Sequence, residues 1–153
     1  MIAIKIKDVK IESLLINYIK DMKGYIANIE DVTKENDNFR KVLYTGKNSQ
    51  LVVMSIAPGD EIGEEVHDLD QFIRIEAGEG KAILDGVEHE IEDDFAIVVP
   101  AGASHNVINT SVDKPLKLYT VYSPPEHKDN IIHRTREDAM NDEDDHFDGI
   151  TTE

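Results

Sequence analysis

Cysteine and tryptophan are both absent from this chain of 153 residues. Without cysteine the protein can form no disulfide, no thiolate metal site and no cysteine nucleophile. A single domain of this length buries roughly 70% of its unfolded surface, so it folds without needing a disulfide or a metal. Any metal site must therefore use nitrogen and oxygen ligands.

Positive charge is also scarce, because 16 lysines and arginines face 32 acids and the formal net charge is −16. Binding to nucleic acid or to an anionic membrane requires clustered cations, so neither partner is expected. No apolar run approaches the roughly 20 residues of a membrane span. The stretch MIAIKIKDVK interleaves lysine with isoleucine, unlike the apolar core of a signal peptide. We expect a cytoplasmic protein.

Residues 1–24 predict a short strand followed by an amphipathic helix. Isoleucine alternates with other residues over 2–6, which is the period of a strand. Apolar side chains then recur at helical spacing at Ile11, Leu14, Leu15, Tyr18, Ile19 and Met22. This apolar stripe packs either on the chain's own domain or on a partner subunit.

Residues 25–125 are predicted to form an all-β domain, a sandwich or a barrel. Short runs rich in β-branched and aromatic residues are FRKVLYT, QLVVMSIA, QFIRIEA, KAILD, VEHEI, FAIVVP and LKLYTVYS. Asp85-Gly86 between two of these runs is a strong signal for a two-residue hairpin turn.

Residues 126–153 form an acidic C-terminal tail with ten acids and three bases. Thr135 and Asp138 have the spacing of a capping box, which predicts a short helix from Arg136. The tail is either solvated or a strap along the domain.

Four polar residues are candidates for a metal site: Glu65, His67 and Gln71 in the stretch EVHDLDQ, and His105 in PAGASHNVIN. Carboxylate and imidazole groups are good ligands for divalent transition metals, and a glutamine amide oxygen is a weaker, neutral one. Glu65 and His67 point to the same face if they lie on a strand. The sequence permits all four groups to converge inside a barrel.

These stretches resemble the two motifs of the cupin superfamily. The first motif is Gly, five residues, His-x-His, three or four residues, Glu, six residues, Gly. Its positions here are Gly59, Glu65, His67, Gln71 and Gly78. The second motif is Gly, five residues, Pro-x-Gly, two residues, His, three residues, Asn. Its positions here are Asp94, Pro100, Gly102, His105 and Asn109. The resemblance implies a cupin-like jelly-roll β-barrel, and by analogy with other cupins a homodimer.

Three positions depart from the cupin pattern. Glu65 replaces the first histidine, Gln71 replaces the glutamate, and Asp94 replaces a turn glycine. The first two changes together move the single carboxylate without removing it, which favours a retained metal site. Exchanging a nitrogen ligand for oxygen favours six-coordinate Mn, Fe or Ni, with Zn as a further option.

The resemblance implies a metal-dependent protein for a small polar molecule. Isomerase-like Lewis-acid catalysis on a sugar or keto acid is one reading. An Fe(II) dioxygenase and a non-catalytic binding or sensor protein are the alternatives. No lysine or arginine shows clear inward parity beside the ligands, which argues against a sugar phosphate. The remaining candidates are interpreted as structural: His89 as an inward core histidine, His127 and His133 as unpaired loop residues, and Tyr119 and Tyr122 as core or rim residues.

Overall fold

The computed structural model describes residues 23–153, so the predicted strand and helix over 1–22 lie outside the described residues. Six strands form the larger sheet: β1 (Arg40–Thr45), β2 (Gln50–Ile56), β3 (Asp70–Ala77), β6 (Ala96–Val99), β8 (Leu116–Ser123) and β9 (Ile132–His133). Three strands form the smaller sheet: β4 (Glu79–Leu84), β5 (Val87–Glu92) and β7 (His105–Asn109). Two helices accompany them, α2 (Ile29–Glu35) and α3 (Arg136–Asn141).

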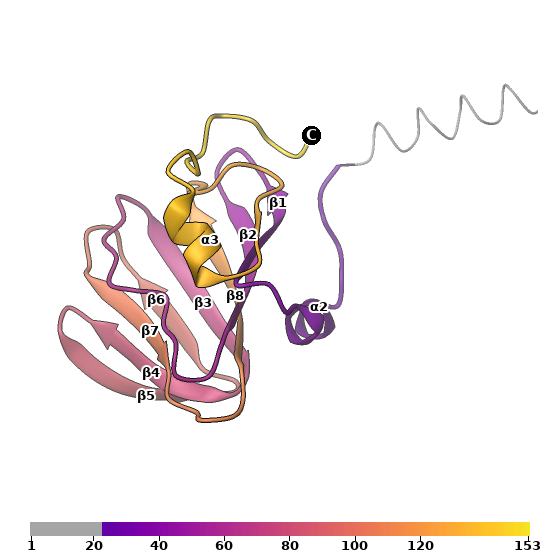
Figure 1. The fold of residues 1–153 in the computed structure, drawn as a ribbon. Helices are drawn as coiled ribbons and strands as arrows, with labels where there is room; N and C mark the ends of the chain where they lie inside the picture. The colour runs from indigo at the N-terminus through magenta and orange to yellow at the C-terminus, as the bar shows by residue number, and fades with distance from the viewer. Residues whose placement is uncertain (1–22) are drawn as a thin grey trace, which may run out of the picture.

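The two sheets curve around a common interior (Figure 1). The larger sheet has the order β6-β3-β8-β2-β1-β9 and the smaller sheet the order β5-β4-β7. Side chains from both sheets fill this interior, and Ile75 on β3, Leu118 on β8 and Val107 on β7 are almost completely buried. This apolar interior supplies most of the folding free energy. The predicted all-β, cupin-like jelly roll is confirmed.

Turns occur where the sequence predicted them. Asp85 and Gly86 both have positive φ, at 47° and 80°, and join β4 to β5 as a tight hairpin. Asp94, which stands where the cupin pattern has glycine, also has a positive φ of 72°. Aspartate tolerates this left-handed conformation better than most residues, and its carboxylate accepts a hydrogen bond from Arg74 at 2.8 Å. The replacement is therefore accommodated within the turn.

Helix α2 was not predicted from the sequence. Asn28 caps its first turn by accepting a hydrogen bond from the Asp31 amide, at 3.3 Å. The helix packs against β8, β3 and β2. Just after it, the buried Lys117 of β8 donates hydrogen bonds to the Asn36 carbonyl and to Asp37. Within residues 23–153, no helix has the length and apolar character required to cross a membrane.

The C-terminal segment, residues 126–153, lies along β1. Its backbone carbonyls accept hydrogen bonds from Phe39 and Val42, at 3.1 and 2.9 Å, and Thr152 donates to Thr45 at 2.9 Å. The capping box of Thr135 and Asp138 is present at the start of α3, as predicted. Helices α2 and α3 lie on opposite sides of the larger sheet (Figure 1).

Candidate metal centre

The segment that carries Glu65 and His67 is held against strand β7. Glu65 and His105 exchange both backbone hydrogen bonds, at 2.9 and 3.0 Å, as an isolated antiparallel bridge. Two residues further on, the His67 carbonyl accepts a hydrogen bond from Gly102 at 2.8 Å. Residues two apart on an extended chain share a face, so Glu65 and His67 both point toward His105. The predicted parity of this stretch is thus present in the structure.

Three of the four candidate ligands converge. The Nε2 atom of His67 lies 3.1 Å from Glu65 Oε2, and that of His105 lies 3.9 Å from the same oxygen. One ligand atom from each of the three residues falls within 4.8 Å of the others. The separations of 3.1 and 3.9 Å are suited to a common cation, because atoms that each bind one ion at about 2 Å lie within about 4 Å of one another.

His105 presents a lone pair to the site. Its Nδ1 lies 3.1 Å from the Ala103 carbonyl, which can only accept a hydrogen bond, so Nδ1 carries the proton. In the neutral ring Nε2 is then an acceptor. This Nε2 atom is buried and has no hydrogen-bond partner among the described residues. A histidine held in this tautomer by a backbone carbonyl has the usual form of a metal ligand.

Gln71, at the start of β3, presents a second acceptor without a partner. Its side chain is buried, and its Nε2 donates to Thr120 Oγ1 at 3.0 Å. Thr120 in turn donates to the Phe72 carbonyl at 2.9 Å, which fixes the direction of the chain of hydrogen bonds. The Gln71 Oε1 atom is left buried with no hydrogen-bond partner within residues 23–153. The amide oxygen is therefore available as an acceptor, of the type that hard cations prefer.

The pKa values of Glu65 and His67 are shifted in opposite directions. Burial by itself would raise the pKa of Glu65, but the hydrogen bond and charge of His67, with Arg40 and His105, lower that pKa below its ordinary value. The hydrogen bond to Glu65 raises the pKa of His67, against the opposing effect of burial. Glu65 and His67 therefore stabilise each other's charged forms, and a metal ion would compete with a proton for the His67 ring.

The donor set fits a divalent ion. Glu65 supplies one negative charge, and His67, His105 and Gln71 supply neutral donors, so a bound ion would keep a net charge of about +1. Two of these donors, on His105 and Gln71, are buried acceptors that no described residue satisfies. Buried polar atoms normally have a partner, and a cation held by Glu65 and His67 would supply one for His105 Nε2.

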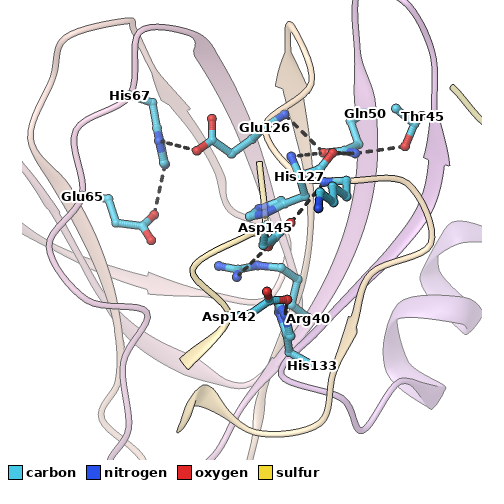
Figure 2. Close-up of polar contacts among 11 residues, drawn as sticks. Arg40, Thr45, Gln50, Glu65, His67, Glu126, His127, His133, Asp142 and Asp145 are labelled. Carbon is cyan, nitrogen blue, oxygen red and sulfur yellow. Dashed lines mark hydrogen bonds and ion pairs between the residues drawn. The ribbon is translucent and has the colours of Figure 1, made fainter. Parts of the chain in front are cut away.

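A second polar cluster lies beside the candidate centre (Figure 2). His127 Nδ1 lies 2.7 Å from Asp145 Oδ2, and Arg40 Nη1 lies 3.9 Å from the same oxygen. All three side chains are at least nine-tenths buried. Tyr122 links the two groups, because its ring contacts that of His127 at 5.1 Å and that of His67 at 6.0 Å, measured between centroids.

Three sequence interpretations are wrong here. His89 is exposed on the edge strand β5 and is not an inward core histidine. His127 is paired with Asp145, and His133 with Asp142 at 2.8 Å. Arg40 is an inward cation near the ligands, which the sequence analysis did not find. The sequence did contain a signal for this orientation, because Arg40 lies two residues before the apolar Val42 and so shares its buried face of β1.

Comparison with known proteins defines the class. The family model of the cupin domain matches residues 52–122. Together with the fold and the two motifs, this places the chain in the cupin superfamily. The chain is 45% identical to the YrkC protein of Bacillus subtilis over 129 residues, which is 80% of this chain and 69% of that protein. It is 43% identical to the solved structure of BH2720 from Bacillus halodurans, covering 78% of this chain and 96% of that one with a TM-score of 0.75.

Proposed function

We propose that this cupin binds one divalent transition metal through Glu65, His67, His105 and Gln71 and uses it to act on a small polar molecule. The observation that carries the proposal is the pair of buried acceptors on His105 and Gln71, which lack partners beside a carboxylate and a second imidazole. The mixed oxygen and nitrogen donors favour six-coordinate Mn, Fe or Ni over tetrahedral Zn.

The chemistry proposed is isomerase-like proton transfer on a sugar or keto acid. When bound, the ion would supply Lewis-acid stabilisation of negative charge on an oxygen of the substrate. Glu65 is engaged as a ligand and is not free to act as a base. Burial raises the pKa of Tyr122 well above its ordinary value, so its hydroxyl stays protonated at neutral pH. Tyr122 can donate a proton or a hydrogen bond, but it cannot act as the base.

The pairing of Arg40 with Asp145 argues against a phosphorylated substrate. A phosphate group is usually bound by cations that are free to form paired hydrogen bonds. Arg40 is the buried cation near the ligands, and the Asp145 carboxylate already offsets its charge. We therefore propose a substrate without phosphate, in which hydroxyl, carbonyl or carboxylate oxygens are the groups recognised.

Metal loading tests the proposal. Protein stripped with a chelator is reloaded with Mn, Fe, Ni or Zn without oxygen, and bound metal is measured by elemental analysis. We expect about one ion per chain, lost in the double variant His67→Ala/His105→Ala. The matched control is His89→Ala/His146→Ala, which removes two exposed histidines away from the site and should keep the ion. Failure of the wild-type protein to take up any metal would refute the proposal.

Turnover assays then distinguish the class of function. An isomerase of sugars or keto acids introduces solvent deuterium at the carbon beside the carbonyl, which NMR detects. Oxygen consumption by the iron-loaded protein would instead indicate a dioxygenase. Ligand binding that shifts NMR signals without any turnover would indicate a binding or sensor protein.

A further inference from the structure

The two ring nitrogens of His67 face two different acids (Figure 2). Nε2 lies 3.1 Å from Glu65 Oε2, on the side of the candidate metal centre. Nδ1 lies 3.5 Å from Glu126 Oε1, on the opposite side. The side chain of His67 is 13% exposed and that of Glu126 is 30% exposed, so solvent screens this contact only in part.

Metal-binding histidines commonly donate their second N–H group to an oxygen outside the coordination shell. His105 already has such a partner in the Ala103 carbonyl, at 3.1 Å. No backbone carbonyl plays this part for Nδ1 of His67 among the contacts of residues 23–153. Glu126 is the group placed there, and as a carboxylate it is the stronger acceptor.

The backbone that carries Glu126 is fixed by a buried glutamine. Gln50, on β2, is completely buried, and its Oε1 accepts hydrogen bonds from the amides of Glu126 and His127, at 3.3 and 2.9 Å. Its Nε2 donates to the His127 carbonyl at 2.7 Å and to Thr45 at 2.9 Å. Moving residues 126–127 would leave a buried amide unsatisfied, so the barrel itself holds Glu126 beside His67.

A second attachment follows directly in the chain. Asp145 accepts hydrogen bonds from His127 Nδ1 at 2.7 Å and from the Lys128 amide at 3.1 Å. Gln50 and Asp145 together therefore hold residues 126–128 in place, and we call these contacts the clamp. Glu126 projects from this clamp toward the metal centre, although it belongs to neither of the two cupin motifs.

We propose that Glu126 is a positioning residue of the metal centre: it accepts the Nδ1 hydrogen bond of His67 and so directs the Nε2 lone pair toward the ion. The inference rests on the proposed metal site. The carboxylate fixes both the tautomer and the ring orientation of His67, and it makes the imidazole a stronger electron-pair donor. The C-terminal segment thereby contributes to metal affinity without contributing a ligand.

Cobalt binding provides the test, because Co²⁺ reports affinity and coordination geometry through its visible absorption. Stripped wild-type protein, Glu126→Ala and Glu126→Gln are titrated with Co²⁺ against a competing chelator. We expect Glu126→Ala to weaken binding by about 10- to 100-fold. Glu126→Gln keeps a neutral acceptor oxygen and should lose less. Because Gln50 holds only the backbone of residue 126, both variants keep the clamp.

The matched control is Glu64→Gln, which removes one negative charge beside the site. Glu64 accepts a hydrogen bond from Ser104 at 2.7 Å, whereas the acids that contact His67 within residues 23–153 are Glu65 and Glu126. Co²⁺ affinity should therefore stay near that of the wild-type protein. An equal loss in this control would show that only net charge matters and would overturn the inference.

A second measurement concerns His67 itself. In the Co²⁺-loaded protein its Nδ1 proton gives a paramagnetically shifted NMR signal, which should exchange slowly with solvent in the wild type and rapidly in Glu126→Ala. Unchanged affinity and unchanged exchange in Glu126→Ala would overturn the role of Glu126 while leaving the metal site intact. If the wild-type protein binds no Co²⁺ or any other ion, the proposed function itself fails.

Discussion

At the scale of single residues, the site is defined by two buried atoms whose lone pairs have no partner. An unsatisfied buried polar group costs about 1–3 kcal/mol. His105 Nε2 and Gln71 Oε1 have no hydrogen-bond partner within residues 23–153. In a binding barrel without metal, an apolar side chain in place of Gln71 would cost one hydrogen bond, to Thr120, and would remove the unsatisfied acceptor. The presence of the amide is therefore understandable if its oxygen serves a cation.

The variant Gln71→Leu tests the role of this oxygen. It removes Oε1 at similar volume, so we expect metal affinity to fall by at least about tenfold. The free energy of unfolding of the ion-free protein should change by no more than about 1 kcal/mol, because an unsatisfied acceptor is lost together with one hydrogen bond. Calorimetric metal titration and urea unfolding measure the two quantities.

The control for this variant is Thr120→Val, which removes the hydrogen bond of Gln71 Nε2 and leaves Oε1 in place. Metal affinity should then decrease much less than in Gln71→Leu. Equal affinity in wild-type protein and Gln71→Leu would limit the ligand set to Glu65, His67 and His105.

At the scale of structural elements, the C-terminal segment is attached to the barrel through Asp145. This carboxylate contacts His127, the Lys128 amide and Arg40. Burial would raise the pKa of Asp145, but the hydrogen bond and charge of His127, with the Lys128 amide and Arg40, lower that pKa below its ordinary value. The carboxylate is therefore ionised at neutral pH and balances the buried charge of Arg40.

The variant Asp145→Asn should lower the free energy of unfolding by about 3 kcal/mol, because it leaves the buried Arg40 without its counter-charge. Urea unfolding of the ion-free protein measures the change. Asp144→Asn, one residue earlier and exposed, should change stability by less than about 0.5 kcal/mol. Equal effects of the two substitutions would show that Asp145 does not act through Arg40.

The strands of the barrel were predictable because alternation and turn residues are local signals. The Asp85-Gly86 hairpin and the capping box of α3 were predictable for the same reason. Helix α2 and strand β9 were missed because they are short and depend on packing against distant strands. The pairing of His127 with Asp145 joins residues 18 apart through an irregular chain path, for which the sequence offers no period.

The residues of the candidate site also differ in how far the sequence could predict them. The spacing of two motifs predicted Glu65, His67, Gln71 and His105 as ligands, and the structure brings Glu65, His67 and His105 together. Glu126 and Arg40 lie outside the motifs and reach the site only through the fold. Motif spacing can predict groups that share one strand or turn, whereas the surroundings of those groups depend on tertiary packing.

At the scale of the whole molecule, two histidines link stability to pH in opposite directions. Burial lowers the pKa of His127, so the unfolded chain binds its proton more readily and stability falls as pH drops below about 6.5. The pKa of His67 is raised. The stability that His67 contributes is therefore fully present below about pH 6.5 and is lost as pH rises through the pKa of His67 in the folded protein. The two effects partly cancel in the intact protein.

Comparing wild-type protein with His127→Gln isolates one of these contributions. Between about pH 7 and pH 5, the wild-type free energy of unfolding should fall more steeply than that of the variant, by up to about 1.4 kcal/mol per pH unit. Urea unfolding with a chelator present measures both slopes. Parallel pH profiles would mean that His127 takes up its proton equally well in the folded protein.

The hydrogen bonds between the C-terminal segment and β1 have a further consequence for the molecule in concentrated solution. The outer edge of β1 would otherwise offer free amides and carbonyls to a neighbouring chain, which is how many sheets begin to aggregate. Residues 131–134 occupy one part of that edge and Thr152 occupies another. The segment that places Glu126 beside His67 therefore also keeps the larger sheet from extending into a second molecule at β1.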